Sequence, residues 1–250
     1  MTFGLIGACV AVYLAVAFAG QGYGYPLNVG LVTQPPDVLG KGALVPALVA
    51  RGEVWLLFSS MFLHAGFIHL ALNMLSLYFL GSFVEVAFGR TRFLALYLTS
   101  GLAGGIAYLY FGDFDGSVVG ASGAIFGLLG GVLGYSLRRG TFSWQNPLIR
   151  QLLILTALNL YFGFSVSNIS NTAHIGGLIG GLAFGWLVAP TVYSEKKVRA
   201  AAPTIIVLGT EMILLAVWLL QHFSWSAKPR IATPSLAKRR ATGGVAPYGR

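Results

Sequence analysis

Long apolar runs separated by short polar segments dominate the chain. A transmembrane helix needs about 20 mostly apolar residues, and seven segments of this kind follow one another. They cover residues 3–20, 67–86, 93–111, 118–137, 148–164, 172–189 and 203–223. The pattern predicts an all-α fold, a polytopic transmembrane helix bundle with a six-helix core and a seventh, C-terminal helix.

The polar segments divide the chain into four parts. Residues 1–190 are expected to form one six-helix membrane domain, because most of their connections are short. A charged linker, 191–202, precedes the seventh apolar run, 203–223. Residues 224–250 are basic and carry few large apolar side chains, so we expect this tail to be disordered.

Composition supports a membrane protein that has the lipid bilayer as its environment. The chain is 56% hydrophobic and 9% charged, whereas soluble domains average roughly 25% charged residues. The net charge of +9 comes from Lys and Arg between the apolar runs, so we interpret it as topological and expect no nucleic-acid partner. The single cysteine, Cys9, excludes a disulfide framework and a CxxC metal site.

The basic residues predict the orientation in the membrane, because Lys and Arg resist translocation. They follow the second, fourth and sixth runs: Arg90, Arg92, Arg138, Arg139, Arg150, Lys196, Lys197 and Arg199. These loops and the N terminus are expected inside, and the 21–65 segment outside. The early first helix favours a bacterial cytoplasmic membrane. If residues 203–223 cross the membrane, the basic tail lies outside, which contradicts the positive-inside rule. Either the tail is an exception, or residues 203–223 do not span the membrane.

Polar side chains within the apolar runs are candidates for function, because a charge at the bilayer centre costs roughly 2.5–3.5 kcal/mol. The candidates are His69, Asn73, Ser122, His174 and Glu211. His69, Ser122 and His174 stand near the starts of the second, fourth and sixth runs, which all begin outside. We expect these three side chains at one depth, about 5–10 Å below the outer surface.

Ser122 and His174 have the chemistry of a nucleophile and its base. A serine hydroxyl needs a base to take its proton, and a neutral histidine suits that task. No carboxylate occurs at this depth in the surrounding runs, so a dyad is predicted. Phe126 lies one turn after Ser122 and is expected to pack on the imidazole. Glu211 has no identified partner, and a structural role fits it as well as a proton relay.

Acyl transfer also needs hydrogen-bond donors for the oxyanion. His69 and Asn73 are four residues apart and share a helix face, so both are candidate donors, together with the Ser122 backbone N–H. Glycines on two runs predict close helix approach beside the site: Gly120, Gly123, Gly127, Gly177 and Gly181. The chain has no HExxH motif and its aspartates lie in loops, so we expect no metal and no cofactor.

Each of these patterns also has an ordinary explanation. Glycine repeats usually pack helices, and a serine among them is usually a small interface residue. His64 and His222 are interpreted as hydrogen-bonded structural residues or as side chains that reach the membrane interface. The combination of the patterns favours catalysis.

At these residues the chain resembles the rhomboid family of intramembrane serine proteases. The resemblance covers 52–188, through GEVW, FLHAGFIHLALNM, FGRTRFLALYLTSGLAGG, GASGAIFGLLG and NTAHIGGLIGG. It implies that Ser122 is the nucleophile, His174 the general base and acid, and Phe126 the ring on that base. His69, Asn73 and the Ser122 amide correspond to the oxyanion hole.

The resemblance also implies a membrane-embedded first loop over 21–65 and a cap over the site at 165–171. Many relatives have Trp-Arg where this chain has Trp55-Leu56, which affects the polar contacts of that loop. The seventh run is similar to the added C-terminal helix of some members.

The expected function is cleavage of transmembrane segments of membrane proteins near the outer face of the bilayer. The partners would be transmembrane protein substrates, and the sequence leaves the oligomeric state open. Two other classes remain as alternatives: a catalytically inactive member that binds membrane proteins, and a transporter or channel.

Overall fold

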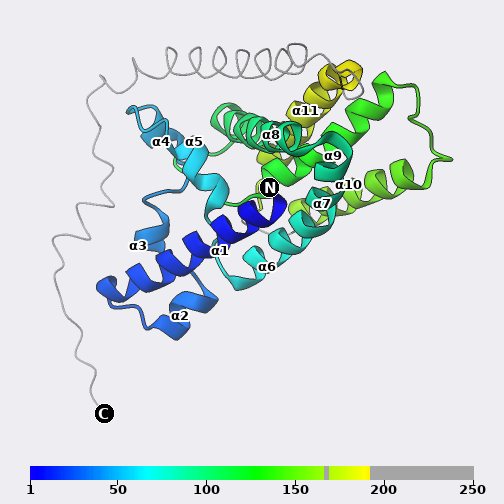
Figure 1. Cartoon of the computed structure of the whole chain (residues 1–250). Helices are drawn as coiled ribbons and strands as arrows, with labels where there is room; N and C mark the ends of the chain where they lie inside the picture. Colours follow the sequence, from blue (N-terminus) through cyan, green and yellow to red (C-terminus); the bar gives the residue numbers. More distant parts are fainter. Residues whose placement is uncertain (166–168, 192–250) are drawn as a thin grey trace, which may run out of the picture.

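The structure is a computed structural model that describes residues 1–165 and 169–191. Within these residues the fold is all-helical (Figure 1), with only two isolated β-bridges. The all-α prediction is therefore confirmed. Residues 166–168 and 192–250 lie outside the described residues, and with them the middle of the predicted cap, the linker after Thr191, the seventh run, the tail, Glu211 and His222.

Six long helical segments correspond to the first six apolar runs. Their bounds are α1 Thr2–Ala19, α6 Phe67–Ser76 continued by η3 Leu77–Gly81 and α7 Ser82–Phe88, α8 Arg90–Phe111, α9 Ser122–Arg138, α10 Pro147–Ser165 and α11 Asn171–Val188, which η4 Ala189–Thr191 follows. The η3 segment is a π-helical turn inside the second long segment.

The 21–65 segment is a chain of short helices. They are η1 Gly20–Tyr23, α2 Leu27–Val32, α3 Pro36–Leu39, α4 Pro46–Val49, α5 Leu56–Ser59 and η2 Ser60–Phe62. Leu56, which stands in the position of the common arginine, is fully buried with Leu44 and Val49, whereas Trp55 is half exposed. An apolar side chain at 56 therefore joins the core beneath this segment.

Three helical segments of the described chain are long and apolar enough to cross a membrane: Thr2–Tyr23, Phe67–Phe88 and Arg90–Phe111. Pro147–Tyr161 is a shorter apolar helix. The glycine-rich α9 has only 17 residues. The number of spanning helices, six with a seventh, thus stays a prediction, as does the division of the chain into four parts.

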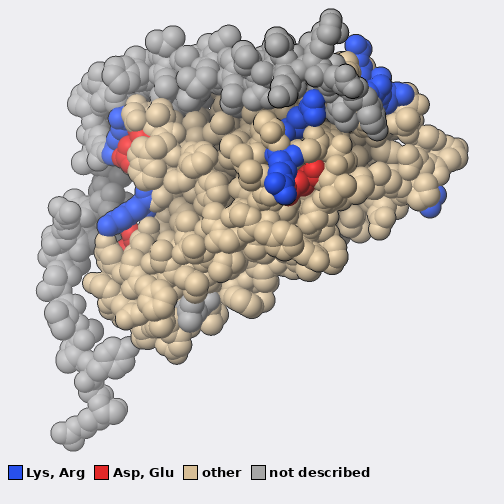
Figure 2. All heavy atoms as spheres, in the orientation of Figure 1, with Lys and Arg blue, Asp and Glu red and all other residues tan. Residues whose placement is uncertain are grey.

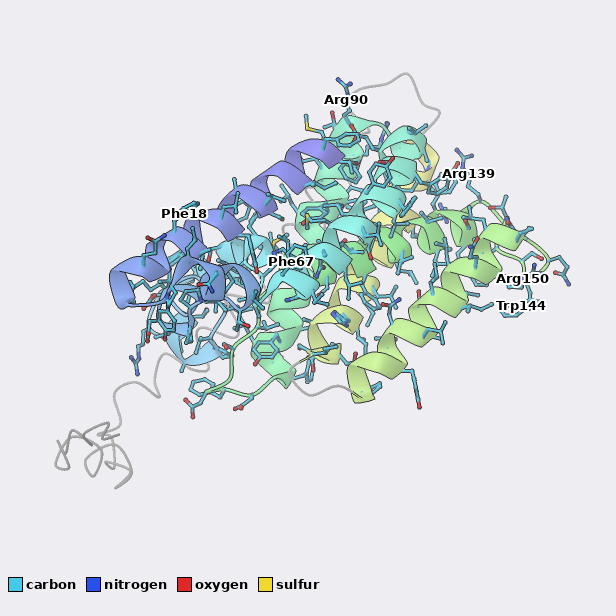
Figure 3. The ribbon with its side chains drawn as sticks, turned by 90° about the horizontal axis from the view of Figure 1, so that it is seen from below. Phe18, Phe67, Arg90, Arg139, Trp144 and Arg150 are labelled. Atoms are coloured by element: carbon cyan, nitrogen blue, oxygen red, sulfur yellow. The ribbon has the colours of Figure 1, made fainter. Side chains whose placement is uncertain are left out.

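The surface fits a bilayer. Large apolar side chains such as Phe18, Phe67 and Phe79 are more than half exposed. Figure 2 shows few charged side chains on the visible face, and Figure 3 shows Arg139, Trp144 and Arg150 together at the end where α9 connects to α10. Such an apolar perimeter is stable in lipid and would be a large exposed patch in water.

Glycines let α9 and α11 meet backbone to backbone. A Cβ atom on Gly177, Gly181 or Gly185 would overlap the carbonyl oxygen of Gly123, Gly127 or Gly131, respectively. Both series advance by four residues in the same direction, so the two helices run parallel and touch along one face each. Without a hydrophobic driving force in lipid, close backbone approach is what holds such helices together.

The first helix is attached to α7 by polar contacts with Glu85. Thr2 is buried, and both its N–H and its hydroxyl donate to Glu85 Oε2, at 2.7 and 2.8 Å. The Met1 ammonium pairs with Glu85 Oε1 at 2.7 Å. These charge-assisted bonds hold one end of α1 against the second long segment.

Candidate active site

Ser122 is the first residue of α9, and an extended segment presents it. Val118 exchanges two backbone hydrogen bonds of 3.0 Å with Leu44, and the Gly120 N–H donates to the Ser60 carbonyl at 2.9 Å. Gly120 has φ +127°, which side-chain-bearing residues rarely adopt. The helix therefore begins at 122 and not at the predicted 118, because pairing with the first loop keeps the preceding residues extended.

His174 comes from the first turn of α11. Ser170 caps this helix, since its hydroxyl accepts from the Ala173 N–H at 3.2 Å. The His174 ring is 8% exposed, and its Nε2 lies 2.8 Å from Ser122 Oγ. At that distance a neutral imidazole can accept the hydroxyl proton.

Phe126 packs on the histidine ring. The two rings are stacked with centroids 4.4 Å apart and an interplanar angle of 11°. His174 Nδ1 is buried and has no hydrogen-bond partner among the described residues. Ring stacking, and not a carboxylate, is therefore what fixes the orientation of this imidazole in the part of the chain described.

His69 lies across the site from His174. The Ala65 N–H points at His69 Nδ1 over 3.4 Å, which assigns Nδ1 as acceptor and places the proton of a neutral ring on Nε2. A Cβ atom on Gly120 would lie 2.8 Å from His69 Nε2 and 3.8 Å from Ser122 Oγ. The imidazole N–H and the serine hydroxyl thus border one small space, which only glycine at 120 leaves open.

Asn73 is buried one turn after His69, but its amide faces its own helix. Asn73 Nδ2 donates to the His69 carbonyl at 2.8 Å, and among the described residues its amide makes no hydrogen bond to Ser122. Ser122, as the first residue of a helix, carries one of the N–H groups without an intrahelical partner. The parts of Asn73 and of the Ser122 amide in an oxyanion hole stay predictions.

A small cavity of about 30 Å³ lies behind the serine. Ser122 lines it together with Met61, Gly104, Gly120 and Gly123. The volume suffices for one water-sized group. The site therefore offers a narrow recess beside the hydroxyl.

Two features of the site were missed from sequence. Leu44 and Ser60 hold the segment before the serine, a pairing across more than 50 residues that local patterns do not reveal. His64 is 1% exposed, so the interpretation of its side chain as one that reaches the membrane interface is wrong. Its ring packs edge to face on His69, with centroids 5.1 Å apart.

The fold and the site define an all-helical, multi-pass membrane protein with a serine and a histidine in contact in its interior. A sequence model described as the Rhomboid domain matches residues 51–191. The chain belongs to the rhomboid family. This match includes every residue of the candidate site.

Similar proteins come from bacteria and plants. Rhomboid protease GluP of Bacillus subtilis (strain 168) is 42% identical over 149 residues, which are 60% of this chain and 29% of that protein. RHOMBOID-like protein 5 of Arabidopsis thaliana is 38% identical over 168 residues, 65% of this chain and 54% of the relative. RHOMBOID-like protein 1 of the same plant is 40% identical over 153 residues, which are 60% of this chain and 39% of that protein. The chain thus spans between about a third and a half of these relatives.

Proposed function

We propose that the chain is an intramembrane serine endopeptidase that cleaves transmembrane segments of membrane proteins near the outer face of the bilayer. The observation that carries the proposal is the 2.8 Å contact between Ser122 Oγ and His174 Nε2 inside a membrane protein of the rhomboid family. The similar GluP protein is named a rhomboid protease.

In this mechanism His174 Nε2 takes the proton of Ser122 as Oγ attacks the scissile carbonyl. The carbonyl oxygen becomes an oxyanion in the space bordered by His69 Nε2–H and the Ser122 amide, where preorganised donors stabilise charge. His174 then gives its proton to the leaving amine, which releases one part of the substrate. A water molecule, activated by the same histidine, hydrolyses the acyl-enzyme.

The substrate helix has to unwind before cleavage, because the amides of an intact helix are shielded and hydrogen-bonded. We expect cleavage near residues that weaken helices, such as Gly and Pro. The positive-inside rule supports cleavage close to the outer face, since it assigns the starts of the second, fourth and sixth helices to that side.

A fluorophosphonate probe tests the dyad directly, because it reacts only with an activated serine. The wild type should be labelled, whereas Ser122→Ala and His174→Ala should be labelled at least about 100-fold more slowly. Gel fluorescence of the purified proteins after a fixed time measures the rates. Equal labelling of all three proteins would show that Ser122 and His174 are not the catalytic pair. Absence of labelling of the wild type would instead favour the alternative of a catalytically inactive member that binds membrane proteins.

The cavity behind Ser122 predicts a preference for a small side chain on the acyl side of the scissile bond. A volume of about 30 Å³ accepts a methyl-sized group and excludes a leucine or phenylalanine side chain. Reporters with Ala at this position should be cleaved at least about 10-fold faster than reporters with Leu, as one or two methylenes in a pocket are worth about 1–3 kcal/mol.

A variant of the cavity wall provides the matched control for this preference. Met61 is buried and lines the cavity, so Met61→Ala enlarges it. The ratio of the cleavage rate of the Ala reporter to that of the Leu reporter should therefore decrease. Competition between the two reporters, followed by mass spectrometry, gives the ratio. An unchanged ratio would mean that another surface sets the preference.

A further inference from the structure

The buried ring of His64 lies beside the site and has no part in the proton transfers. It is 1% exposed, and burial, together with the nearby His69 ring, lowers its pKa to about 3. At neutral pH it is therefore an uncharged ring in contact with a candidate oxyanion donor. Its edge-to-face contact with His69, at 5.1 Å and 64°, is a geometry that aromatic rings favour.

The residues that follow His64 are held in place by backbone pairing with an earlier segment. Thr33 and Gly66 form an isolated antiparallel bridge, and the Gln34 N–H donates to the Ala65 carbonyl at 2.9 Å. The residues that lead from His64 into α6 are therefore fixed by residues 33–34 of the same first loop. A side chain on a fixed loop can restrain its neighbour more strongly than one on a mobile loop.

The His69 ring is held by one long hydrogen bond in addition to its contact with His64. Its bond from the Ala65 N–H is long, at 3.4 Å, which makes it weak. The opposite side of the ring faces Gly120, which has no side chain to pack on it. The ring of His64 packs edge to face on the His69 imidazole and therefore limits its rotation.

We infer that His64 is a positioning residue, whose ring holds His69 with its Nε2–H directed at the space where the oxyanion forms. This role rests on the proposed protease function and deepens it, because His64 acts only through His69. His64 itself touches neither the substrate nor the reacting atoms. Its contribution comes from the shape of the ring and not from its nitrogens.

A double-mutant cycle in the 250-residue chain, reconstituted with a single-span reporter, tests the inference. His64→Ala should lower kcat about 10-fold to 100-fold with little change in KM. The upper end of this range equals the smallest loss that removal of an oxyanion-hole donor typically causes. His64→Phe keeps a ring at this position and should stay within about 3-fold of the wild type. In the His69→Ala background, His64→Ala should cause no further loss.

Thermal unfolding of every variant separates positioning from folding. Leu63→Ala is the matched control, because Leu63 is buried next to His64 in the chain and its side chain lies against Gly42. Leu63→Ala should lower the melting temperature. Its effect on kcat should be the same in the wild-type background and in the His69→Ala background. If His64→Ala does not fold, His64→Leu fills most of the space without a ring and replaces it in the cycle.

Two results would overturn the role of His64. One is an equal loss from the His64 substitution in both backgrounds, and the other is a His64→Phe variant as impaired as the alanine variant. Failure of the proposed function looks different: the wild type would not cleave the reporter, or His69→Ala would cleave it at the wild-type rate.

Discussion

Ser122→Ala is expected to lower the rate of reporter cleavage by at least about 10³-fold while the protein remains folded. The substitution removes only the hydroxyl that lies 2.8 Å from His174, and loss of a catalytic nucleophile in serine hydrolases costs this much or more. Single-turnover cleavage of a purified single-span reporter measures the rate, and thermal unfolding verifies that the fold is intact.

Ser136→Ala is the matched control for this experiment. Ser136 is also a buried serine on α9, and at 1.5 Å per residue it lies about 20 Å from Ser122 along the helix. Its replacement should leave the cleavage rate within about 2-fold of the wild type. Cleavage by the Ser122→Ala protein at the wild-type rate would show that the hydroxyl is not the nucleophile.

Gly181→Val should damage both stability and activity, because it separates α9 from α11. Any Cβ atom at Gly181 overlaps the Gly127 carbonyl, so the helices have to move apart. Overpacking costs about 3 kcal/mol, which corresponds to a decrease in Tm of about 6–12 °C for a chain of this size. Ser122 and His174 stand on these two helices, so their contact should lengthen and kcat should fall.

A glycine on the outside of the fold controls for the substitution itself. Gly7 lies on α1, where a Cβ atom would meet nothing within 4 Å. Gly7→Val should change Tm by less than about 2 °C and leave cleavage unaffected. If Gly181→Val were equally mild, the close contact between α9 and α11 would not be what holds the two catalytic side chains together.

The features that sequence predicted well are those with a local, periodic signal. Long apolar runs predicted the all-helical membrane fold, and the runs with His69, Ser122 and His174 became α6, α9 and α11. The four-residue spacing of Gly177 and Gly181 indicated a small-residue face, and the structure brings that face against Gly123 and Gly127. In each case the relevant residues lie within a few turns of one another.

The features that sequence missed depend on contacts between distant segments. The start of α9 is set by Leu44 and Ser60, which pair with the residues before Ser122. Helices such as α3 and α4, with four residues each, are too short to show a period. The burial of His64 follows from the first loop folding against α6, and a single histidine in a sequence carries no sign of that.

The glycine contacts between α9 and α11 also limit how the length of the protein can vary. Because each contact joins backbone to backbone and recurs every four residues, the two helices are matched turn by turn. One residue inserted between His174 and Gly177 would turn the imidazole by about 100° around the α11 axis and shift it by about 1.5 Å. Insertions and deletions should therefore be tolerated in the connections, such as that between α9 and α10, and rejected within these two helices.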